Sequence, residues 1–204
     1  MKSYPLILTA GEVRAVLNGT KTQHRVMVKP QPPAGYERAR VCGPWGEWEN
    51  DAPPLGKFST RCQFGTPGDR LWVRETFGFN HYDDGNTRAW KRTLYRADGL
   101  EEPSDNGSPA PWRSPLAMPR RLSRLTLEVE SVRVQRVQDI SKEDAKAEGA
   151  TAFPRDPDGD CWTDGTHRTA FNYAWNEKHG WWPTAWDRND WVFALTFKRV
   201  EGTR

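Results

Sequence analysis

The chain has 204 residues, of which 36% are hydrophobic, and a net charge of +3 from 30 Lys plus Arg against 27 Asp plus Glu. This length suits one domain with insertions. The low apolar share, combined with 11 Trp and 8 Phe, predicts a small aromatic core edged by long polar loops. No run of 18 apolar residues occurs, so we expect no membrane span and, from the N-terminus, no signal peptide.

The cysteines and histidines give no sign of a metal or a disulfide framework. Cys42, Cys62 and Cys161 lie far apart and form no CxxC pair, and the histidines lack metal-ligand spacing. We therefore expect no metal, no cofactor and a reducing, cytoplasmic setting. The basic residues are mainly arginine, which grips phosphate and stacks on bases better than lysine does. A solvated surface explains the same composition.

The first predicted element is a helix over residues 10–18. Thr9 and Glu12 form a capping-box pattern, apolar residues follow at helical spacing, and Gly19 is placed to end the helix. Residues 21–28 then read as an extended segment.

The next predicted strand follows the turn sequence TPGD and alternates over RLWVRETF. Trp72 and Arg74 lie on one face, and Glu75 lies on the other among apolar residues. A buried carboxylate needs a partner, and here either Lys21 or an arginine would serve, in a ligand site or in a purely structural ion pair. Trp72 and Arg74 form either a stacking and phosphate-binding pair or the cover of a sheet edge.

Three later elements complete the chain. A long strand over 125–136 changes its apolar phase, which indicates a bulge near Ser131. Ser141 caps a second short helix that ends before Gly149, and the last strand spans 191–200. Irregular insertions are predicted at about 30–66, 80–119 and 150–190, with a short hairpin possible in the first, a strand near 90–95 in the second and a helix over 166–180 in the third.

These elements predict an α+β fold over a single domain, residues 1–204. Strands of this length around two short capped helices favour a small, partly open mixed β-barrel. The Trp-rich segment 180–191 either packs the third insertion onto this barrel or forms an aromatic wall near a cleft.

The residues after the first helix are the leading candidates for a site. On an extended chain, Lys21, Gln23 and Arg25 point to one side, and Thr22 and His24 point to the other. The first side offers several donors, which suits an anion or a base edge. A polar edge strand guarded by cations is the alternative.

A second basic group lies within the sequence MPRRLSR, residues 118–124. Arg120, Arg121 and Arg124 lie close together there and would form either a clamp on a nucleic-acid backbone or a solvated turn.

Several motifs in order resemble a known family. They are GTKTQHR after the capped helix, PGDRLWVRETF, YRADG, MPRRLSRLTLEVESVRVQRVQDISKEDAKAEG and WVFALTFKRV. Together they are similar to the ASCH domain, a branch of the PUA-like barrels found in phage and prophage proteins. The resemblance implies binding of RNA or modified bases, and at least one bacterial branch is an amidohydrolase that acts on acetylcytidine.

The family's cleft motif is similar to G-x-K-x-x-T-x-R. Gly19 and Lys21 match it, whereas His24 stands at the threonine position and Val26 at the arginine position. Lysine, threonine and a glutamate form the proposed catalytic set of the amidohydrolase branch, which implies Lys21, His24 and Glu148 here. Because His24 lacks the nucleophilic hydroxyl, it would act as a base on water.

The predicted cleft lies between the two capped helices. Lys21, Gln23, Glu75 and Glu148 are expected to line it, with His24 and Arg25 at its mouth. The leading hypothesis is a phage-type ASCH protein that binds nucleic acid or a nucleobase, modified or not, as RNA or as a single-stranded or flipped-out base. The alternative is a hydrolase, either of acetylcytidine-like nucleosides or a weak ribonuclease. A third reading is a protein-interaction module, for which the sequence gives no positive sign.

Overall fold

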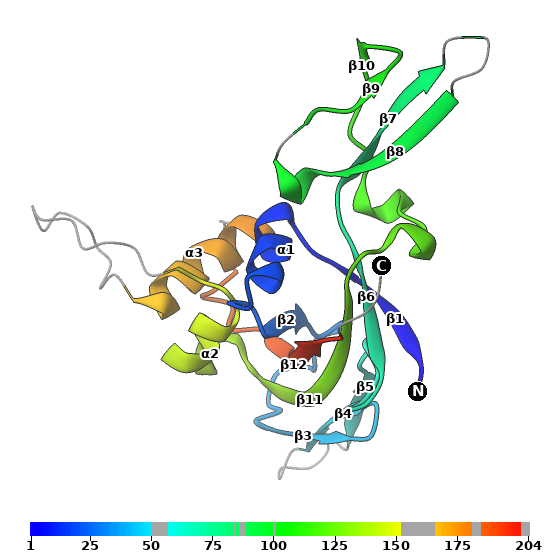
Figure 1. Cartoon of the computed structure of the whole chain (residues 1–204). Helices are drawn as coiled ribbons and strands as arrows, with labels where there is room; N and C mark the ends of the chain where they lie inside the picture. Colours follow the sequence, from blue (N-terminus) through cyan, green and yellow to red (C-terminus); the bar gives the residue numbers. More distant parts are fainter. Residues whose placement is uncertain are drawn as a thin grey trace, which may run out of the picture.

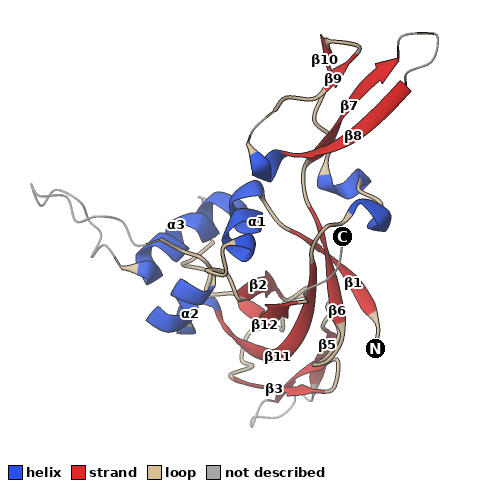
Figure 2. Ribbon diagram, viewed as in Figure 1, coloured by secondary structure: helices blue, strands red, loops and turns tan. Residues whose placement is uncertain are grey.

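The structure is a computed structural model that describes residues 1–49, 57–83, 85, 89–99, 101–151, 166–180 and 185–200. It has three sheets and three α-helices within these residues, with the helices gathered on one side of the largest sheet (Figures 1 and 2). The predicted α+β class is therefore confirmed.

The largest sheet has five strands in the order β1-β6-β11-β12-β2. Only β1 and β6 pair in parallel, and the other neighbours are antiparallel. Because β1 and β2 stand at opposite ends of this order, the described strands do not close into a barrel. The five strands are β1 (Ser3–Ile7), β6 (Arg70–Arg74), β11 (Thr126–Arg136), β12 (Trp191–Arg199) and β2 (Gln23–Met27).

The predicted bulge in β11 is confirmed by a register shift between Val129 and Ser131 in its pairing with β12. On β12, every residue from Trp191 to Leu195 is buried, so the strand does not show the expected alternation. The cause is a core on each face: Trp191 and Phe193 join the main core, whereas Val192 joins a second core with residues of α2 and α3.

The three helices begin where the chain supplies a capping side chain. Thr9 and Glu12 form the predicted capping box of α1 (Ala10–Leu17). Ser141 caps α2 (Lys142–Ala147) as expected, and Thr166 caps α3 (His167–His179) in the third insertion. Thr9 and Ser141 each satisfy one of the backbone N–H groups that a helix start leaves free.

The first two insertions are more regular than predicted. Residues 38–49 form an antiparallel hairpin, the short hairpin left open by the sequence, and residues 58–61 add a third antiparallel strand to it. The wholly buried Trp48 ties this sheet to the main core, where its ring meets Trp191 at a centroid distance of 5.9 Å. Few residues there are β-branched and many are Gly or Pro, so local propensity did not reveal the strands. They are β3 (Arg38–Cys42), β4 (Trp45–Glu49) and β5 (Phe58–Arg61).

The second insertion projects from the body of the molecule as a β-arm (Figure 1). The predicted strand near residues 90–95 is present as β8, and its partner β7 continues directly from the segment after β6. The strands of this sheet are β7 (Phe77–Asp83), β8 (Ala89–Tyr95), β9 (Ser104–Asp105) and β10 (Ser108–Pro109). The described residues also contain four 3-10 turns, η1 (Arg96–Asp98), η2 (Pro115–Ala117), η3 (Arg120–Leu122) and η4 (Val137–Asp139).

Other sequence predictions concern single residues and membrane segments. Cys42 is exposed and Cys62 is buried, both as free thiols, whereas Cys161 falls outside the described residues. The Trp-rich segment packs through Trp186, whose ring lies 6.3 Å from that of Phe171, while 181–184 fall outside the described residues. Among the helices of the described ranges, none has the length and apolar character needed to cross a membrane.

Candidate functional site

The chain places Lys21 between the ends of two helices. Gly19, with a φ of 75°, turns the chain away from α1. The backbone N–H of Lys21 then donates to the carbonyl of Ala15 at 3.0 Å, and the N–H of Thr22 donates to the carbonyl of Ala147 at 2.8 Å. Lys21 is thereby held beside the C-terminal ends of both α1 and α2.

Gly149 allows α2 to approach this closely. Its φ of 83° favours glycine, and an added Cβ would lie 3.2 Å from the Cβ atoms of both Ala15 and Lys21. Lys21 and Glu148 consequently form an isolated antiparallel β-bridge. Gly149, which the sequence marks as the end of the second helix, therefore also positions Glu148, the acidic partner of Lys21.

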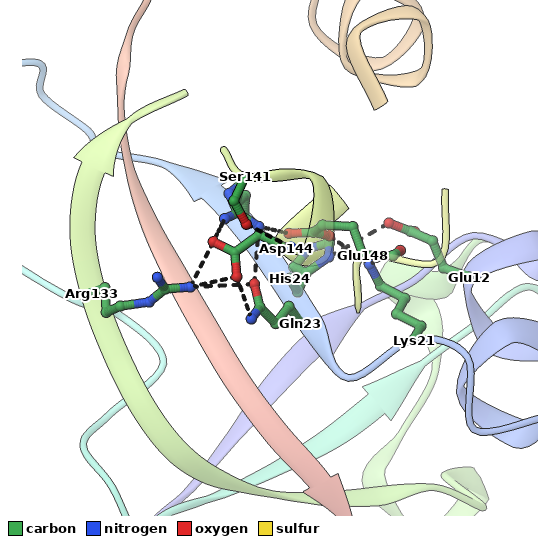
Figure 3. A network of polar contacts seen from close by, with 9 residues as sticks. Glu12, Lys21, Gln23, His24, Arg133, Ser141, Asp144 and Glu148 are labelled. Atoms are coloured by element: carbon green, nitrogen blue, oxygen red, sulfur yellow. Dashed lines mark hydrogen bonds and ion pairs between the residues drawn. The ribbon is translucent and has the colours of Figure 1, made fainter. Parts of the chain in front are cut away.

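Lys21 and Glu148 form a buried ion pair. The two residues are 3% and 9% exposed. The Nζ of Lys21 donates to Oε2 of Glu148 at 2.7 Å and to its backbone carbonyl at 2.9 Å (Figure 3). An ammonium has three N–H donors, so one remains after these two bonds.

The charge of Glu148 is stabilised despite its burial. Burial acts to raise the pKa of its carboxyl, but Lys21, His24 and Arg25 lower that pKa below its usual value. The carboxyl therefore stays ionised at neutral pH, which maintains the ion pair.

Arg25 is buried and contacts Glu148 of this pair. The prediction that Arg25 lies at the mouth of a cleft is therefore wrong. The Arg25 side chain is 0% exposed and donates from Nη1 to Oε1 of Glu148 at 2.9 Å and from Nη2 to Oδ2 of Asp144 at 2.7 Å. Gln23 and Arg133 also donate to Asp144 (Figure 3). Arg25 and Gln23 thus both point toward α2, where they hold the Asp144 carboxylate, and Arg25 also holds that of Glu148. The prediction that Gln23 lines the cleft is wrong, because Gln23 is not among the residues that line the hollow beside Lys21.

His24 is buried as well, at 4% exposed, rather than lying at the mouth. Strand alternation predicted that His24 points away from Lys21 and Arg25, which is wrong, because all three line the same hollow. The Nδ1 of His24 lies 3.5 Å from Oε1 of Glu12 and has no hydrogen-bond partner among the described residues (Figure 3). Burial and the charge of Lys21 lower the pKa of His24 from 6.5 to about 3, so the ring is neutral at physiological pH.

Glu12 is a further titratable group at this site, and it was not among the site residues predicted from the sequence. Burial acts to raise the pKa of its carboxyl, but His24 and Lys178 outweigh burial and lower it to about 2. No sequence pattern placed Glu12 in the site, because its role in the capping box of α1 already accounts for a glutamate at this position. Its Oε2 does accept from the backbone N–H of Thr9 at 2.8 Å, yet its Oε1 is directed at His24.

These side chains surround a hollow of about 240 Å³. One water occupies roughly 30 Å³ of liquid, so the hollow can admit a small organic molecule, although it is smaller than the usual ligand site of about 300–1,000 Å³. Its polar lining is Glu12, Lys21, His24, Arg25, Glu148 and Lys178, and its apolar lining is Gly11, Ala15, Gly149, Ala150, Phe171, Ala174 and Trp175.

The aromatic wall comes from α3, in the third insertion. Phe171 and Trp175 lie with ring centroids 5.7 Å apart at an interplanar angle of 31°, and the Nε1 of Trp175 is buried without a partner in the described structure. Sequence analysis predicted a helix at 166–180 but not its position over Lys21, because only tertiary packing brings the two together. The hollow therefore lies between α1 and α3, above the end of α2.

Glu75 does not line this hollow. It is 1% exposed and accepts two bonds from Arg124, at 2.9 Å from Nε and 3.1 Å from Nη2. Burial raises the pKa of Glu75, and Arg124 opposes that shift. Of the alternatives left open by the sequence, the structure shows an arginine partner in an ion pair away from Lys21.

Arg124 is consequently unavailable for the predicted backbone clamp, since it also contacts Asp98 at 2.7 Å. Arg120 and Arg121 are exposed on η3. Trp72 and Arg74 are half-buried and contact each other, with the guanidinium carbon 5.4 Å from the ring centroid. Of the predicted basic cluster, only the first two arginines are exposed.

Thr22 points away from Lys21, as strand alternation predicted, and lines a separate hollow of about 520 Å³ on the other side of the Lys21–Glu148 bridge. Thr22 therefore does not supply the hydroxyl that His24 lacks at the threonine position of the family motif.

Within the described ranges, no group of three His, Cys, Asp or Glu residues is arranged to hold a metal ion.

Comparison with protein-family models, with curated proteins and with solved structures returned no match for this chain.

Proposed function

We propose that this chain is a nucleobase-binding protein of the ASCH, PUA-like type, with the Lys21–Glu148 hollow as its binding site. The observation that carries the proposal is the convergence of a buried ammonium and a buried carboxylate on a hollow with an aromatic wall. The resemblance of the GTKTQHR and AKAEG motifs to the ASCH family adds the nucleic-acid context, with a phage or prophage origin and a bacterial cytoplasmic setting.

The lining suits a planar, polar heterocycle. Phe171 and Trp175 are 6% and 4% exposed and line one side of the hollow, so they offer an apolar wall to the edge or face of a ring, and base–aromatic contacts contribute about 1–3 kcal/mol per base. The free N–H of Lys21 can donate to a carbonyl oxygen or ring nitrogen of a base. The lining residues carry opposite charges, with Glu12 and Glu148 against Lys21, Arg25 and Lys178, which suits a neutral base better than a naked anion.

The depth of the hollow also favours a base that is not stacked in a duplex. A volume of about 240 Å³ between two helices cannot admit a base pair, so the base must be free, single-stranded or flipped out. Exposed Arg120 and Arg121 would then contact phosphates of the flanking strand.

A thermal-shift screen against nucleosides, modified nucleosides and short RNA and DNA oligonucleotides tests this proposal. A ligand at 100 times its Kd stabilises the folded state by about 2.7 kcal/mol, which raises Tm measurably. A shift with one base class, reproduced by calorimetry, supports the proposal. No shift with any nucleoside or oligonucleotide contradicts it.

A hydrolase is the second candidate, because a neutral His24 lies beside the Glu12 carboxylate and in the same lining as Lys21. His24 would take a proton from water, the resulting hydroxide would add to the acyl carbon, and Lys21 would stabilise the oxyanion. Collapse of this intermediate would break the C–N bond, and the amine of the nucleoside would leave with the proton held by His24. Turnover of acetylcytidine that disappears in Lys21→Ala and Glu148→Ala supports this candidate. Absence of acetylcytidine turnover at high enzyme concentration contradicts the hydrolase candidate. Release of fragments from RNA would indicate a ribonuclease instead.

A further inference from the structure

The orientation of the Glu12 carboxylate defines which nitrogen of His24 carries its proton. Glu12 is the third residue of α1, and the capping box engages one oxygen, Oε2, with the backbone N–H of Thr9 at 2.8 Å. The other oxygen, Oε1, is thereby directed to Nδ1 of His24 at 3.5 Å and to Nζ of Lys178 at 3.4 Å. Helix capping therefore fixes a carboxylate beside one particular ring nitrogen.

His24 holds a single ring proton. The ring is 4% exposed, and burial together with Lys21 and Lys178 disfavours its protonated form, against the opposing effect of Glu12 and Glu148. A neutral imidazole donates from one nitrogen and accepts at the other. A lone pair on Nδ1 would face the Glu12 anion, so electrostatics favours the proton on Nδ1.

The gap of 3.5 Å between Nδ1 and Oε1 is longer than a hydrogen bond. Such contacts are often long in a ligand-free site and shorten when the site fills. A displacement of a few tenths of an ångström would satisfy Nδ1, which has no other partner among the described residues.

We propose that Glu12 fixes the proton of His24 on Nδ1, so that Nε2 acts as a hydrogen-bond acceptor that selects bases with an N–H group beside a carbonyl oxygen. The inference rests on the proposed nucleobase site. The carbonyl oxygen would accept the remaining N–H of Lys21, and the base N–H would donate to Nε2 of His24. Uracil, hypoxanthine and guanine have such an edge, and so does an amino group that carries an acyl substituent. Glu12 acts through His24 and is a positioning residue.

Nitrogen-15 NMR of the histidine-labelled full chain at pH 7 tests the tautomer directly. The expected spectrum shows His24 protonated on Nδ1. In Glu12→Gln the amide oxygen keeps the Thr9 cap, because glutamine also serves in a capping box, and its NH₂ group then faces His24. The proton should move to Nε2. Thr9→Ala is the matched control, since it weakens the same helix cap but retains the carboxylate, and it should leave the tautomer unchanged.

The ligand arm uses bases that differ by one methyl group: uridine against 3-methyluridine and inosine against 1-methylinosine. Loss of a hydrogen bond to a buried acceptor predicts at least a tenfold preference for the unmethylated member in the wild type, and loss of that preference in Glu12→Gln. A proton on Nε2 in the wild type, or binding without discrimination against the methyl group, overturns the inference and leaves the nucleobase site standing. Failure of every nucleobase to bind overturns the proposed function, whereas the NMR result still decides the tautomer.

Discussion

The ammonium of Lys21 lies 2.7 Å from a carboxylate oxygen of Glu148, although the two residues are 127 positions apart in the chain. The contact joins the end of α1 to the end of α2. It also forms the polar base of the hollow that Phe171 and Trp175 line. Its geometry underlies both the proposed binding site and the stability of this part of the fold.

Replacement of Lys21 by methionine should destabilise the protein by about 3 kcal/mol. Removing one partner of a buried ion pair leaves the other charge uncompensated and costs about 3–5 kcal/mol. Arg25 still contacts Glu148, which places the expected loss at the lower end. Urea denaturation followed by circular dichroism measures the free energy of unfolding.

Lys198→Met is the matched control for this substitution. Lys198 pairs with Glu128 at 3.0 Å, but its side chain is 57% exposed. Water screens such a pair, so the free energy of unfolding should not change measurably. Equal effects of the two substitutions would show that the Lys21–Glu148 pair is not buried in solution.

Stability should fall as the pH is lowered from about 6.5. The pKa of His24 is lowered from 6.5 to about 3 in the folded state, so the unfolded chain binds a proton first and unfolding is favoured between these values. The Glu12 carboxyl, lowered from 4.5 to about 2, acts in the same direction at lower pH. Its stabilisation is present above pH 4.5 and is lost toward pH 2.

His24→Gln should flatten the pH dependence between about pH 6.5 and 4.5, where the carboxylates of Glu12 and Glu148 do not yet titrate. His179, whose pKa burial lowers to about 4, contributes to the same window, so part of the slope should remain and should disappear in His179→Gln combined with His24→Gln. Denaturation curves at half-unit pH intervals give this slope. An unchanged slope in the double variant would contradict buried neutral histidines.

Arg124→Met should destabilise the fold by about 3–5 kcal/mol at pH 7, because Glu75 would lose its partner while 1% exposed. Burial already raises the pKa of Glu75, and the substitution should raise it further. A folded-state pKa above the unfolded value makes the penalty largest at high pH, and it shrinks as the pH falls toward 4.5.

The double variant Glu75→Gln, Arg124→Met serves as the control. Without the carboxylate, the cost of Arg124→Met should lose its pH dependence, as measured by unfolding at pH 5 and pH 7. A pH-independent cost in the single variant would mean that Arg124 acts through packing on Tyr95, whose ring centroid lies 4.1 Å from its guanidinium carbon.

Replacing both Arg120 and Arg121 by alanine should weaken oligonucleotide binding and reduce its salt dependence. Each phosphate contact on a single strand contributes about 0.7 to the slope of log K against log salt. The slope should therefore fall by about 1.4, measured by fluorescence anisotropy across a salt series. Arg40→Ala, at an exposed arginine that pairs with Glu47 outside the hollow and η3, controls for charge, and the same slope in all three proteins would exclude contacts from η3.

Local signals predicted the elements that position the site. Thr9, Glu12 and Gly19 defined α1, and Ser141 and Gly149 defined α2, because caps and stops depend on neighbouring residues only. The pairing of Lys21 with Glu148 came from the family resemblance. No local pattern predicts a bridge between residues so distant in sequence.

The parts of the fold and of the site that local sequence patterns did not predict depend on tertiary packing. Trp48 and Trp191 hold the sheet of β3, β4 and β5 against the core, although that segment reads as Pro- and Gly-rich loop. Phe171 reaches the hollow only because α3 packs against α2 and faces α1 across the hollow. The burial of His24 and Arg25 was missed for the same reason, since the helices cover this end of β2.

Calorimetric titration of the best nucleoside or oligonucleotide into the wild type and Ala174→Trp shows whether the hollow beside Lys21 is the binding site. Ala174 is exposed on α3 and lines the hollow, so a tryptophan there should fill the hollow without disturbing the core. Glu177→Trp, at an exposed position on the same helix outside the lining, is the control. The account predicts saturable binding to the wild type and Glu177→Trp and at least a tenfold weaker Kd for Ala174→Trp. Equal affinity in all three proteins would contradict it.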